Sequence, residues 1–76
     1  MIVFLNKKEL NKRIGFRIRE LRVEKKLSLQ EFSDKLDMEY NNLIRIEKGR
    51  TNPSATTLYH IARTLDVKLK DIVDIE

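Results

Sequence analysis

Residues 27–53, LSLQEFSDKLDMEYNNLIRIEKGRTNP, decide the fold of this chain. The stretch predicts two short helices that are joined by a tight turn and followed by an exposed polar loop. Ser28 and Glu31 have the spacing of a capping box, so the first helix is expected to begin after Ser28. Residues 37–39 have the length of a turn. The second helix covers about residues 40–48 and ends before a glycine, a common helix terminator.

The predicted helix over residues 40–48 has two unlike sides, because successive side chains are 100° apart. The inner side is apolar apart from one carboxylate: Leu43, Ile46 and Glu47. The outer side, its tip and its flanks hold the side chains open to a partner: Tyr40, Asn41, Asn42, Ile44, Arg45 and Lys48. Asparagine can pair bidentately with adenine, and arginine with guanine. The residues alone leave two interpretations open, a solvated polar face and a surface that reads DNA bases.

Length and composition narrow the classes of function. Seventy-six residues make one domain with a thin core, and cysteine is absent. There is no metal-ligand spacing, no glycine-rich phosphate loop and only one histidine, so an enzyme, a metal site and a cofactor are not expected. No apolar run approaches the roughly 20 residues of a membrane span. Residues 1–50 carry 13 Lys or Arg against 8 Asp or Glu, a basic balance that suits contact with a polyanion.

Apolar periodicity predicts three further helices. The first begins after Asn6 and buries one stripe at helical spacing: Leu10, Ile14, Ile18 and Leu21. The fourth is capped by Ser54 and buries a second stripe: Leu58, Ile61, Ala62 and Leu65. A short fifth helix follows near the C-terminus. The apolar residues 2–5 are either a loose tail or a cover for Phe16 and Val23 on the first helix.

The order and spacing of several motifs carry a family resemblance. They are Ile14-Gly15, Arg17-Ile18-Arg19, Leu21-Arg22, Leu27-Ser28, Ile46-Glu47-Lys48-Gly49 and Asn52-Pro53-Ser54, continued by Thr57-Leu58, Ile61-Ala62, Leu65, Val67 and Leu69. Together they resemble the phage-repressor helix-turn-helix family (Cro- and lambda-repressor-like, also called Xre). The resemblance covers residues 14–73 and implies an all-α fold, a compact bundle of five short helices with the helix-turn-helix at the second and third. Residues 1–6 are then an N-terminal tail, and residues 7–76 a single DNA-binding domain.

Four positions depart from the family pattern. Leu29 stands where the family usually has a polar residue, and Glu39 where it usually has Ser or Thr. Ser33 replaces a usual alanine, and Asp37 replaces a usual glycine in the turn. Serine is small enough to keep two helices close, and aspartate tolerates the left-handed backbone better than most residues. Leu29 weakens the case for a side-chain phosphate contact at its own position.

The resemblance implies a sequence-specific DNA-binding transcriptional regulator, a repressor or autoregulator, in the cytoplasm of a prokaryote or of a mobile element's host. A dimer would bind double-stranded DNA at an inverted-repeat operator, with neither a membrane nor a small-molecule ligand as partner. Base edges would be read by Tyr40, Asn41, Asn42, Ile44 and Arg45. Phosphates would be held by Ser28, Gln30, Lys48, Arg50, Thr51 and Asn52.

Two structural roles also follow from the resemblance. Arg22 and Glu47 would form a partly buried ion pair. A C-terminal surface would join the two copies, with Leu69, Ile72, Val73 and Ile75 as its candidate residues, although some of these apolar residues must also close the core. Two alternatives stay open. If the loop after Gly49 does not bind phosphates, it is an ordinary polar turn. If the chain does not read DNA, it is a protein-interaction module that keeps the fold, and Leu29, Glu39 and Ile44 favour this alternative.

Overall fold

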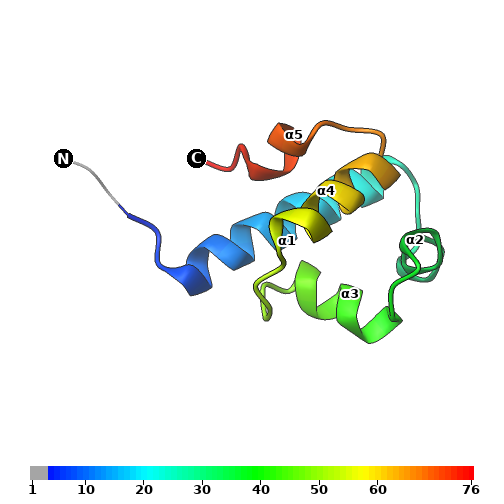
Figure 1. Ribbon diagram of the computed structural model, residues 1–76, viewed down its shortest axis with the longest axis horizontal. Coiled ribbons are helices and arrows are strands. Elements are labelled where there is room, and N and C mark those ends of the chain that lie inside the picture. The colour runs from blue at the N-terminus through cyan, green and yellow to red at the C-terminus, as the bar shows by residue number, and fades with distance from the viewer. Residues whose placement is uncertain (1–3) are drawn as a thin grey trace.

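The computed structural model describes residues 4–76, which form five α-helices and no strand (Figure 1). The helices are α1 (Lys7–Glu24), α2 (Leu29–Leu36), α3 (Tyr40–Glu47), α4 (Ala55–Thr64) and α5 (Leu69–Val73). The predicted all-α bundle of five short helices is therefore confirmed. The long helix α1 packs against both α3 and α5, and α2 packs against α3 and α4. In Figure 1, α3 lies below α1 and α5 lies above it.

All five helices contribute to one apolar core. Its buried residues are Ile18, Leu21, Phe32, Leu43, Ile46, Leu58, Ile61, Ala62, Leu65 and Ile72. Each large aliphatic side chain that leaves water here stabilises the fold by about 1.5–3 kcal/mol before the cost of ordering it. The prediction that Leu10 belongs to the buried stripe of α1 is wrong, because Leu10 is 38% exposed. Leu10 lies in the first turns of α1, near the end of that helix that is farthest from α2 (Figure 1).

Side-chain caps begin three of the helices, as the sequence predicts. The side chains of Asn6 and Ser54 accept hydrogen bonds from backbone N–H groups three residues later. At α2 the capping box is complete, because the Ser28 hydroxyl accepts from the Glu31 N–H at 3.0 Å and Glu31 accepts from the Ser28 N–H at 2.9 Å. Each cap satisfies backbone donors that have no partner within the helix.

A residue with positive φ follows the end of each of α1 to α4: Lys26, Asp37, Gly49 and Asp66. The next N–H then returns to a carbonyl five residues earlier, as Met38 does to Ser33 at 2.9 Å. This bond closes the last turn and satisfies a carbonyl at the helix end. The prediction that Asp37 takes the left-handed conformation of the family's glycine is confirmed by its φ of 53°.

The expected cover of α1 by residues 2–5 can be compared with the structure only at Phe4 and Leu5, and Phe4 does not provide it. Phe4 is 84% exposed, and Phe16 and Val23 are both exposed on the surface of α1. Residues 1–3 lie outside the described part of the chain. Within residues 4–76, no helix combines the length and the apolar character needed to cross a bilayer.

Candidate nucleic-acid interface

The turn between α2 and α3 is short and well satisfied. Asp37 and Met38 donate their N–H groups back to α2 carbonyls at 3.1 and 2.9 Å. Ser33, which is 1% exposed, donates its hydroxyl to the carbonyl of Gln30 at 2.9 Å. The buried serine therefore keeps the small volume of the family's alanine and leaves no polar atom unpaired. This turn sets the direction in which α3 leaves α2.

An ion pair holds α3 against α1. Arg22 Nε donates to Glu47 Oε2 at 2.7 Å, and Arg22 Nη2 donates to Glu47 Oε1 at 3.1 Å. The two side chains are 10% and 6% exposed, so the pair is largely shielded from water. Arg22 Nη1 also donates to the carbonyl of Leu27 at 2.8 Å, which ties in the segment that leads to α2. The predicted pairing of Arg22 with Glu47 is therefore confirmed.

The outer side of α3 is open. Leu43 and Ile46 are buried in the core, whereas Tyr40, Asn41 and Arg45 are exposed. Within residues 4–76, the side chains of these three exposed residues form no hydrogen bond or ion pair with the chain itself. Their donors and acceptors are therefore free to meet the edges of bases.

The two flanking residues of α3 face different hollows. Asn42 is half-buried and lines a hollow with Met38, Thr57 and His60, on the side of α4. Ile44 is half-buried beside Leu29, at the junction of α2 and α3. The five residues proposed for base reading thus divide into three that point outward and two that face shallow hollows at the edges of the helix.

The predicted phosphate-binding residues lie at the two ends of this surface. Ser28 and Gln30 are exposed at the start of α2, and Lys48, Arg50 and Asn52 are exposed after α3. Gln30 already donates its side-chain N–H to Asp34 at 2.9 Å. Thr51 differs from the rest, because its hydroxyl is buried and has no hydrogen-bond partner among the described residues.

The N-terminus of α2 is less favourable for binding a phosphate than the resemblance implies. Leu29 packs against the core and not outward, so it has no polar group to offer. The backbone N–H of Ser28, and after it the Ser28 hydroxyl, hold the pKa of Glu31 below its ordinary value. Glu31 is therefore a carboxylate at neutral pH. It already accepts the hydrogen bond of the Ser28 N–H, so this donor is not free for a phosphate.

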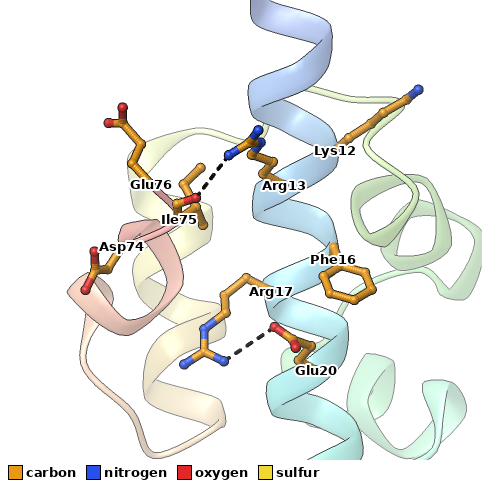
Figure 2. Close-up of a pocket in the computed structure, with 8 residues that line it drawn as sticks. All are labelled: Lys12, Arg13, Phe16, Arg17, Glu20, Asp74, Ile75 and Glu76. Carbon is orange, nitrogen blue, oxygen red and sulfur yellow. Dashed lines mark hydrogen bonds and ion pairs between the residues drawn. The ribbon is translucent and has the colours of Figure 1, made fainter. Parts of the chain in front are cut away.

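The C-terminal residues lie beside α1, as Figure 2 shows. Arg13 Nη1 donates to the carbonyl of Ile75 at 3.5 Å, and Arg17 Nε donates to the carbonyl of Asp71 at 2.8 Å. The prediction that Ile72 contributes to a surface between copies is wrong, because its side chain is fully buried in the core of one chain. The other three predicted residues of that surface, Leu69, Val73 and Ile75, keep at least part of their side chains accessible.

Sequence reasoning missed a group of cations on α1. Lys8, Lys12 and Arg19 line one hollow together with Lys48 and Arg50, which follow α3. The signal was present in the basic balance of the first 50 residues and in the helical spacing of these three residues.

A protein-family model described as helix-turn-helix matches residues 18–72. The chain belongs to this helix-turn-helix family. The HTH-type transcriptional regulator DdrOP3 of Deinococcus deserti is 36% identical to it over 58 residues, which are 76% of this chain and 45% of that protein. The immunity repressor protein of Bacillus phage phi105 is 35% identical over 60 residues, which are 79% of this chain and 42% of the repressor. The helix-turn-helix chain thus spans less than half the length of these two relatives.

The solved structures agree with the family assignment. The crystal structure of the restriction-modification controller protein C.AhdI from Aeromonas hydrophila matches this helix-turn-helix chain with a TM-score of 0.77 and 26% identity. The match covers 80% of this chain and 92% of the controller protein. The resemblance inferred from the motifs is therefore confirmed at the level of family and fold.

Proposed function

We propose that the chain is a sequence-specific DNA-binding transcriptional regulator that places α3 in the major groove. The observation that carries the proposal is the outer side of α3, where Tyr40, Asn41 and Arg45 are exposed with no internal partner among residues 4–76. An α-helix fits the major groove, and amide and guanidinium groups match the base edges found there. The pair formed by Arg22 and Glu47 fixes the angle at which α3 is presented.

Around this centre we assign supporting contacts. Asn42 and Ile44 contact the bases at the edges of the helix, where Ile44 is suited to a thymine methyl group. Ser28, Gln30, Lys48, Arg50 and Asn52 bind phosphates and fix the register without reading sequence, and Thr51 takes part through its backbone N–H. The DNA-binding unit comprises residues 7–76, and the residues before it form a tail.

We further propose that two copies act together on an inverted repeat. Leu69, Val73 and Ile75 keep apolar atoms accessible at the C-terminal end, where they would meet the same residues of a second copy. A two-fold pair of recognition helices reads two half-sites about one helical turn apart. Relatives named as a transcriptional regulator and as an immunity repressor support a regulatory role for this unit, with repression as its proposed direction.

Selection of binding sites from random double-stranded DNA tests the proposal. The full chain is expected to enrich one motif with inverted symmetry, and the variant Asn41→Ala/Arg45→Ala is expected to enrich none. Both side chains are exposed, so the variant should retain the wild-type melting temperature and serves as a folded control. Equal recovery of all sequences by the wild-type protein would refute base reading.

The second candidate is an interaction module that keeps the fold without reading DNA. Two observations favour it: Leu29 packs on the core where the family offers a polar side chain, and Glu39 places a carboxylate at the tip of α3. Salt separates the two functions, because DNA affinity falls steeply as salt rises, with a slope of about −0.9 for each phosphate contacted. A protein partner held by apolar contacts would show a much smaller dependence.

A further inference from the structure

A basic hollow lies between α1 and the end of α3. Its lining includes six cationic side chains: Lys7, Lys8, Lys12, Arg19, Lys48 and Arg50. Glu47 is the one carboxylate among the lining residues, and both of its oxygens accept hydrogen bonds from Arg22. Within residues 4–76, none of the six cations forms an ion pair. The hollow therefore concentrates positive charge that the described chain does not neutralise.

The two walls of the basic hollow are held together by a close backbone contact. Gly49 has a φ of +73°, and a Cβ atom on it would lie 2.5 Å from the Cα of Lys12. Only a glycine allows this approach, which sets Lys12 beside Lys48 and Arg50. The cations of α1 are thus positioned relative to the loop that we propose as a phosphate-binding segment.

The cationic side chains of α1 project from two different sides of the helix. Arg13 and Arg17 face the C-terminal residues and donate to their carbonyls, whereas Lys12 and Phe16 project on the other side (Figure 2). The first group is occupied by contacts within the fold. Lys12 and its neighbours along the hollow have no such structural task among the described residues.

A nearly buried asparagine gives a second observation. Asn11 is only 7% exposed, and it lines the basic hollow. No hydrogen bond to its side chain is found within residues 4–76. Its amide atoms are not fully enclosed, so its N–H donors are accessible to a phosphate oxygen at the mouth of the hollow.

We propose that the basic hollow binds the DNA strand whose phosphates pass the C-terminal end of α3. Lys8 and Lys12 neutralise these phosphates, and Asn11 donates a hydrogen bond to one of them. The inference rests on the proposed DNA binding and extends the phosphate contact at the loop after Gly49, whose Arg50 lines the same hollow, onto α1. Such contacts anchor the register of α3 but carry no sequence information.

Salt dependence tests the inference on an operator found by selection. The variant Lys8→Gln/Lys12→Gln is expected to reduce the slope of log affinity against log salt by about 0.9 for each phosphate that the protein no longer neutralises. Between 50 and 200 mM salt, each such phosphate makes the fall in affinity about 3.5-fold smaller. The matched variant Lys35→Gln/Lys70→Gln removes the same charge from α2 and α5 and should keep the wild-type slope.

Replacing single phosphates by uncharged methylphosphonates shows which phosphates contact the basic hollow. Single methylphosphonate substitutions along the operator should weaken the wild-type protein at one or two positions where they do not weaken the Lys8→Gln/Lys12→Gln variant. An unchanged slope, or the same pattern of sensitive phosphates in both proteins, would overturn the inference while leaving the function intact. Failure of the wild-type protein to select any operator would instead remove the proposed function itself.

Discussion

Arg22 and Glu47 join α1 to α3 through two hydrogen bonds, of 2.7 and 3.1 Å, between side chains that are almost completely shielded from water. Arginine suits this position because its planar fork meets both oxygens of a carboxylate. The pair lies directly behind the exposed side of α3, so it connects the stability of the fold with the geometry of the proposed interface.

Replacing Glu47 by alanine should lower the free energy of unfolding by about 3–5 kcal/mol, because Arg22 is left as a buried charge without a partner of opposite charge. Thermal or urea unfolding followed by circular dichroism measures the effect. Glu24→Ala is the matched control, since Glu24 is exposed near the end of α1, and the stability of this variant should stay near the wild-type value. Equal stability of both variants would show that the pair does not support the fold.

Gly15 lies where α1 meets the end of α3, and a larger residue should not fit there. A Cβ atom on Gly15 would lie 2.3 Å from the carbonyl oxygen of Ile46 and 2.5 Å from that of Glu47. Because both obstacles are backbone atoms, Gly15→Ala should force the helices apart and cost about 1–3 kcal/mol or more, despite the higher helix propensity of alanine. Glu20→Ala, on the exposed side of α1, is the control in the same unfolding experiment. A stabilised Gly15→Ala protein would contradict the close approach.

Lys26 should be improved by glycine. Its φ of 58° lies in the left-handed region, where the β-carbon of an L-residue crowds the backbone at a cost of about 1–2 kcal/mol. Lys26→Gly removes this strain but gives the unfolded chain more freedom, so the net gain should be about 0.5–1 kcal/mol, a rise of several degrees in Tm. Lys25→Gly is the control, because Lys25 has a φ of −82° and should lose stability. The opposite order of the two Tm values would refute the argument.

Local signals made much of this fold predictable. The capping box of Ser28 and the apolar periodicity of α2 and α3 act within one or two helical turns, so the sequence alone places these helices to within a residue. The pairing of Arg22 with Glu47 was implied by family resemblance, and the need to neutralise a buried carboxylate supports it.

The remaining features depend on how the helices are arranged in space. Leu10 fits the apolar stripe of α1, yet its burial depends on how far the helix extends past its neighbours. Ile72 and Val73 are adjacent in a helix too short for periodicity to decide which one faces inward. Lys26 carries no glycine or asparagine signal for a left-handed residue. The burial of the Thr51 hydroxyl likewise arises from packing that no short motif encodes.

The capping box should make stability depend on pH at the acidic end. The hydrogen bonds from Ser28 lower the pKa of Glu31 in the folded chain below the value of 4.5 that an unperturbed glutamate has. The carboxylate therefore favours folding above that value, and this contribution is lost as the pH falls through the lowered pKa. Glu31→Gln should flatten this part of the profile of Tm against pH. The reference is Glu24→Gln, which removes an exposed carboxylate outside the box. Identical acid profiles for both variants would exclude a role for the cap.

Two arginines near the end of α3 should affect DNA binding in different ways. Arg45 lies on the outer side of α3, so Arg45→Ala should reduce discrimination between the operator and single-base variants of it by about 1–3 kcal/mol at the base pair it reads. Arg50 lies in the loop after α3 and lines the basic hollow, so Arg50→Ala should weaken the operator and unrelated DNA by the same factor and lower the salt slope by about 1. Titration of fluorescent duplexes at several salt concentrations separates the two effects. If Arg50→Ala altered base preference and Arg45→Ala did not, α3 would not be the element that reads the sequence.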